Sequence, residues 1–64
     1  MRPIIGPGGK VLGYEQDNGS EIVLLAPGGI VLGKYVKAAD MTVTAGGRLV
    51  GYGNLLMTLL EDPP

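Results

Sequence analysis

Apolar residues in this chain come in short runs separated by glycine-rich turns. Gly-Gly is flanked by mostly apolar residues three times, in segments 4–14, 24–34 and 42–52, which align without gaps at spacings of 20 and 18 residues. Each copy has a small residue, Pro or Ala, Gly-Gly, one variable residue, two aliphatic residues and a further Gly. Val, Ile, Leu, Thr and Tyr favour extended backbone, and Gly accepts positive φ in a turn. The pattern predicts a threefold repeat of β-hairpins within a single domain, residues 1–64.

The turn residues predict how these hairpins are connected. Pro27-Gly28-Gly29 suits a three-residue loop with a type I turn and a G1 bulge, in which Leu25 faces Val31 and Leu24 faces Leu32. Asn18-Gly19 is a strong hairpin signal and should reverse the strand 10–16 into the strand 21–26. Segment 37–40 lacks Gly and Pro, which favours a wider turn or a bulge.

Residues 54–60 fit two structures. Asn54 could cap a short helix of leucines, or the segment could be a seventh strand that replaces half of a missing fourth repeat. We expect the strand, because Leu59-Leu60 follows Thr42-Val43 by 17 residues, close to the repeat period. Residues 61–64 end in two prolines and are expected to fray.

Both faces of the expected strands are apolar. A half-exposed strand alternates apolar and polar residues, but segments 22–26 and 30–32 are aliphatic throughout. One small sheet cannot cover both its faces, so the hairpins should either close into a barrel-like or solenoid form or be completed by oligomerisation. Gly13, Gly33 and Gly51, at one equivalent position in each copy, indicate a barrel corner or the close approach of a neighbouring subunit.

Composition strengthens the case for self-association. A chain of 64 residues is marginally stable without help, and it has no cysteine for a disulfide and no histidine for a zinc site. Other copies of the chain are the remaining source of stability. A net charge of −1, with no basic run, does not favour nucleic acid or a membrane surface as a partner. With no signal peptide or membrane span, a soluble cytoplasmic protein is expected.

Few residues suggest chemistry. Catalytic arrangements that need His or Cys are impossible within one chain, and we expect no catalytic residue, cofactor or metal. One set of aromatic and basic residues, partly at equivalent repeat positions, could stack a small ligand or single-stranded bases. The set is Tyr14, Lys34, Tyr35, Arg48 and Tyr52. Tyrosines that cap strand ends by burying their rings would explain the aromatic positions without a ligand.

The repeated pattern of aliphatic pair, turn ending in Gly, aliphatic pair and Gly, often followed by Tyr, resembles small bacterial repeat proteins of unknown function, including those with β-flower domains. That resemblance covers residues 4–60 and implies an all-β repeat domain with symmetric assembly and no catalytic residue. Segment 22–33 also resembles a coil of a bactofilin, a cytoskeletal β-solenoid, which would imply end-to-end polymerisation. Bactofilin cores have many more coils than three, and Asn18-Gly19 predicts a tight reversal where a solenoid turns gradually.

Together these observations predict an all-β fold of three Gly-Gly hairpins in a small antiparallel meander, barrel-like and completed by homo-oligomerisation. The expected function is a non-enzymatic structural or interaction protein whose partner is itself. The alternative is a binding module that uses the tyrosines and basic residues named above.

Overall fold

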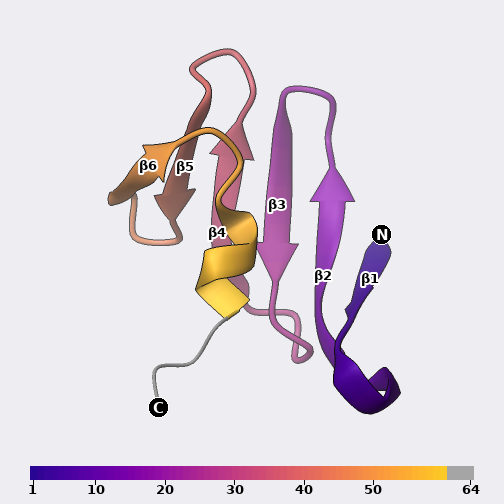
Figure 1. The fold of residues 1–64 in the computed structure, drawn as a ribbon. Helices are drawn as coiled ribbons and strands as arrows, with labels where there is room; N and C mark the ends of the chain where they lie inside the picture. The colour runs from indigo at the N-terminus through magenta and orange to yellow at the C-terminus, as the bar shows by residue number, and fades with distance from the viewer. Residues whose placement is uncertain (61–64) are drawn as a thin grey trace.

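The computed structural model describes residues 1–60, which form one antiparallel sheet with six strands in chain order (Figure 1). The strands are β1 (Arg2–Ile5), β2 (Val11–Asp17), β3 (Glu21–Leu25), β4 (Val31–Val36), β5 (Met41–Thr44) and β6 (Leu49–Tyr52). Two short 3₁₀ helices, η1 (Pro7–Gly9) and η2 (Leu56–Leu60), follow β1 and β6. The all-β class and the antiparallel meander are therefore confirmed. The fraying expected for residues 61–64 lies outside the described residues.

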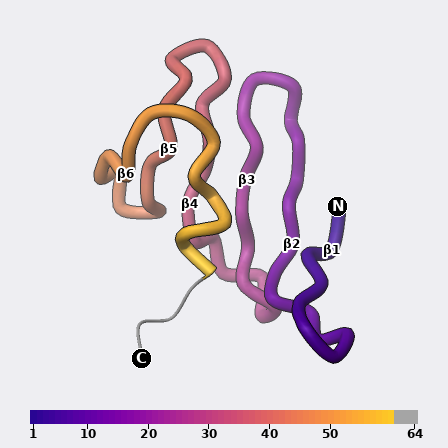
Figure 2. Tube along the Cα trace, viewed as in Figure 1, coloured from indigo at the N-terminus to yellow at the C-terminus, as the bar shows by residue number. Residues whose placement is uncertain are grey.

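The sheet is open, so the prediction of a barrel-like form is wrong. β1 and β6 lie at opposite ends of the strand order and do not pair with each other (Figure 2). A barrel needs a hydrogen-bonded ladder between its first and last strands. Here β1 carries Pro3, which has no N–H to donate to such a ladder.

The predicted turns form where the sequence places them. In the second hairpin, Gly29 has φ +88° and its N–H donates to Ala26 O at 2.8 Å, as expected for a type I turn followed by a G1 bulge. Gly9 and Gly47 also have positive φ. Asn18-Gly19 reverses β2 into β3, with Gly19 at φ +91°. The wider turn expected at 37–40 is present and ends at Asp40, whose φ is +52°.

Each Gly-Gly hairpin contains a β-bulge, in which the second strand has one extra residue that pairs with no residue of the first strand. Leu25 pairs with Val31 as predicted, but Leu24 pairs with Gly33, so the prediction that Leu24 faces Leu32 is wrong. The same shift separates the pair Ile4 and Gly13 from the next pair along β1 and β2, and it recurs between β5 and β6. A bulge of this kind leaves one residue unpaired and strengthens the local twist. Because of it, a glycine and not a leucine lies opposite Leu24.

Residues 54–60 do not form the expected strand. The segment turns at Gly53 (φ +82°) and continues into the 3₁₀ helix η2, with the Leu56 N–H donating to Asn54 Oδ1 at 3.2 Å. The alternative of a short helix capped by Asn54 is thus the correct one. The tertiary contacts described below decide it: these leucines pack on the face of the sheet, and a seventh strand would point half of them away from it.

The buried core is small. Among the described residues, Leu24 and Leu56 are the apolar side chains with no solvent exposure, and Thr42 is equally buried. The η2 segment lies in front of β4 in Figure 1 and contacts it. We call this side of the sheet the covered face; residues on it include Gly13, Leu24, Gly33, Thr42 and Gly51. The opposite side is the open face.

Candidate interaction surfaces

Three glycines on the covered face form a track for the C-terminal segment. A Cβ atom built on Gly13 would lie 3.2 Å from Leu60 Cδ2, one on Gly33 would lie 2.5 Å from Leu59 Cδ1, and one on Gly51 would lie 2.6 Å from Leu55 Cδ1. Any side chain at these positions would compete with a leucine. We call Gly13, Gly33 and Gly51 the glycine track, and residues 54–60 the strap. The strap fits this face because the track has no side chains.

The track explains the repeated glycines in a way that the sequence did not suggest. The barrel-corner interpretation is wrong because the sheet does not close. Within the described residues, the segment that approaches these glycines is the strap of the same chain, which was not predicted, and the approach of a neighbouring subunit stays a prediction. The backbone also approaches closely, since Cβ atoms on Gly13 and Gly33 would lie 2.6 Å from Leu25 O and Val43 O respectively.

Thr42 holds the beginning of the strap. Its Oγ1 donates to Gly53 O at 2.7 Å and accepts from the Leu55 N–H at 2.9 Å. The side chain is fully buried on β5, so no water competes for these hydrogen bonds. A polar residue in an apolar strand is a weak sequence signal, and sequence reasoning missed this function of Thr42. The two hydrogen bonds set where the chain leaves β6 and crosses the sheet.

The open face is an apolar surface that nothing in residues 1–60 covers. Residues that pair across an antiparallel ladder have their side chains on the same face of the sheet, so the strand register shows which residues belong to the open face. They are Pro3, Ile5, Val11, Tyr14, Gln16, Glu21, Val23, Leu25, Val31, Lys34, Val36, Met41, Val43, Leu49 and Tyr52. Ile5 is 56% exposed, Val31 43% and Leu49 53%. The two charged members, Lys34 and Glu21, form an ion pair at 2.9 Å, so the face carries no net charge.

The predicted aromatic and basic set does not converge on one point. Tyr14, Lys34 and Tyr52 share the open face, but they lie on β2, β4 and β6. Successive members are two strands apart, roughly 10 Å. Tyr35 lies on the covered face, since it pairs with Thr42, and Arg48 is exposed in the turn before β6. The structure therefore places three of the five on one surface.

Two exposed hydrogen-bond groups stabilise the turns at one end of the sheet. The Tyr35 hydroxyl donates to Asp40 Oδ1 at 2.6 Å, and this bond to a carboxylate raises the pKa of Tyr35. Asp17 accepts from the Gly19 N–H at 2.8 Å and from Lys37 Nζ at 3.0 Å, and these bonds lower the pKa of Asp17. Both pairs tie strand ends to their turns.

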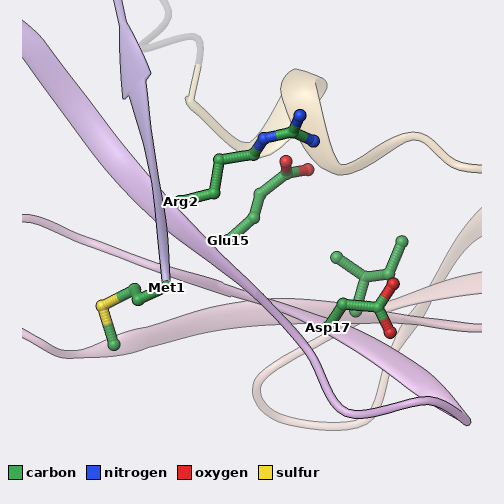
Figure 3. A pocket seen from close by; sticks show the side chains of 5 residues that line it. Met1, Arg2, Glu15 and Asp17 are labelled. Carbon is green, nitrogen blue, oxygen red and sulfur yellow. The ribbon is translucent and has the colours of Figure 1, made fainter.

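A shallow hollow of about 360 Å³ lies beside the first three strands, lined by Met1, Arg2, Glu15, Asp17 and Ile22. In Figure 3 the side chains of Arg2 and Glu15 extend next to each other, while Asp17 lies farther along the sheet. The hollow is partly open to solvent, and the charged side chains that line it are of both signs. In the part of the chain that the structure describes, no three His, Cys, Asp or Glu side chains are grouped to hold a metal ion.

Comparison with protein-family models, with curated proteins and with solved structures finds no match to this chain. Among residues 1–60, no helix has the length and apolar character needed to cross a bilayer.

Proposed function

We propose that this protein is a non-enzymatic structural or interaction protein that acts as a symmetric homo-oligomeric β assembly. The open face is the observation that carries the proposal. It is a mostly apolar surface with residues from all six strands, and it lies on the other side of a sheet whose buried core contains two leucines. A monomer would leave this surface in water, where contiguous apolar patches of such extent mark interaction sites.

The energetic balance favours a partner. Each aliphatic side chain that becomes fully buried contributes about 1.5–3 kcal/mol to stability. A chain of this length buries on folding only about 60% of the surface that its unfolded form exposes. Ile5, Val31, Leu49 and Tyr52 are all more than two-fifths exposed on the open face. Covering them in a second copy would add the stability that the small core does not provide.

Solution mass tests the proposal. Light scattering of the purified chain at micromolar concentration should give a multiple of 6.6 kDa. A folded protein with the mass of one chain over this range would overturn it.

Matched variants locate the contact. Val31→Glu puts a carboxylate on the open face at a site that is 43% exposed, so the single chain should still fold. Association should weaken at least tenfold, because the charge would have to be buried without a partner. Met57→Glu is the control, since Met57 is 46% exposed on η2, at the covered face. Equal association of Val31→Glu and the original chain would contradict the use of the open face.

A further inference from the structure

The edge at β1 is poorly suited to adding another strand. The Gly6 N–H donates to Lys10 O at 2.7 Å, which makes this a hydrogen-bonded pair. Hydrogen-bonded and non-hydrogen-bonded pairs alternate along an antiparallel ladder, so Ile5 and Pro3 direct their backbone groups away from β2. Proline has no N–H, and the Ile5 N–H is therefore the one outward donor between Arg2 and Gly6. Proline on an edge strand is a common protection against strand addition.

The edge at β6 is interrupted in a different way. The Thr44 N–H donates to Arg48 O at 2.8 Å and the Gly53 N–H donates to Asp40 O at 2.7 Å. By the same alternation, Leu49 and Tyr52 direct their backbone groups outward. The bulge lies between them, so Leu49 and Tyr52 are three residues apart in sequence. In a regular strand, residues that direct their backbone groups to the same edge are two residues apart. A bulge in an edge strand disturbs the spacing that a new strand would need.

With both edges interrupted, the open face is the surface left for a second copy. Six strands about 4.8 Å apart, with a mean length of five residues, cover roughly 29 by 17 Å in plan. The plan area of about 490 Å² is roughly three-fifths of the 800 Å² or so that each partner buries in a standard interface, and side chains that project from the sheet make the accessible area larger than the plan area. The face also has no net charge that would repel a second copy, because Lys34 and Glu21 neutralise each other within one copy.

We infer that two copies pack open face against open face as a twofold β-sandwich, with the straps on the outside. This inference rests on the proposed function and adds the geometry of the assembly. Sheets that pack face to face lie about 10 Å apart with strands roughly 30° from parallel. In a twofold contact the same patch is used by both copies, so one apolar face serves as both halves of the interface.

Amide hydrogen exchange separates this geometry from edge pairing. In the ¹⁵N-labelled full chain, at a concentration where light scattering gives the oligomer, the outward amides of Ile5, Leu49 and Tyr52 should exchange rapidly. The Leu24 amide, in the middle of the sheet, is the protected reference. If strands add at β6, the Leu49 and Tyr52 amides become protected to a similar degree as Leu24.

Nuclear Overhauser effects between differently labelled copies provide the second measurement. A mixture of ¹³C-labelled and unlabelled chains should show contacts between copies at the methyl groups of Val23 and Val43, which lie on the open face. Contacts between copies confined to strap methyls, or protection of the β6 amides, would overturn the sandwich while leaving self-association intact. A monomer by light scattering would overturn both the sandwich and the proposed function.

Discussion

Substitution of Gly33 by alanine tests the packing of the strap on the sheet. A Cβ atom at Gly33 would lie 2.6 Å from Val43 O and 2.5 Å from Leu59 Cδ1. The leucine can rotate, but the carbonyl oxygen belongs to the neighbouring strand and cannot move without disturbing the ladder. Overpacking of this kind costs about 1–3 kcal/mol. Gly33 has no positive φ, so alanine itself is not strained there, and the loss of glycine flexibility in the unfolded chain returns about 0.4–1 kcal/mol.

The net effect of Gly33→Ala should be a loss of about 1–2 kcal/mol of unfolding free energy, or about 4–16 °C in Tm for a domain of this size. Thermal and urea unfolding followed by circular dichroism measure it, with all variants at one protomer concentration because association changes apparent stability.

Two control variants make the comparison specific. Gly51→Ala meets the flexible end of Leu55 and no backbone atom, so it should cost less than Gly33→Ala. Gly28→Ala meets nothing within 4 Å and has no positive φ, so it should be neutral or slightly stabilising. If Gly33→Ala is as stable as Gly28→Ala, Val43 O and Leu59 do not lie as close to Gly33 as described; if Gly51→Ala costs nothing relative to Gly28→Ala, Leu55 does not pack tightly against Gly51.

Two further substitutions test the polar contacts. Thr42→Val should lower the unfolding free energy by about 2–3 kcal/mol, because it leaves Gly53 O and the Leu55 N–H without their buried partner, whereas Thr42→Ser should retain most of the stability in urea unfolding. Asp40→Asn, which tolerates the same positive φ, should lower the pKa of Tyr35 towards its usual value of about 10 in an ultraviolet titration. Because the folded-state pKa of Tyr35 is raised, its contribution to stability is present below about pH 10 and is lost as pH rises through the folded pKa; an unchanged titration in Asp40→Asn would contradict the hydrogen bond.

Local turn chemistry was predictable because it depends on neighbouring residues. Gly29 and Gly19 adopt the positive φ expected of them, and the strands on either side form. The register within the hairpins was less predictable. A bulge moved Gly33 opposite Leu24, and no local preference for Leu32 over Gly33 distinguishes the two registers.

The segment 54–60 shows where local reasoning is insufficient. Leucine is compatible with both strand and helix, and the repeat period favoured a strand. The outcome depended on the three glycines of the track, two of them far away in sequence, which leave space on one face of the sheet for Leu55, Leu59 and Leu60. The five predicted ligand-binding residues were likewise distributed by the pleat over two faces and a turn, an arrangement that depends on the registers of all six strands.

The amino-acid sequence by itself determined the strands, the tight turns and the excess of apolar residues over what one small sheet can bury. Each of these follows from backbone preferences and composition, which act over a few residues or over the chain as a whole. The tertiary structure decided that the sheet stays open, that the strap covers one face and that the other face is left apolar. Those outcomes depend on bulges, on the missing N–H of Pro3 at an edge, and on the match between distant glycines and leucines. Only the folded chain brings these features together.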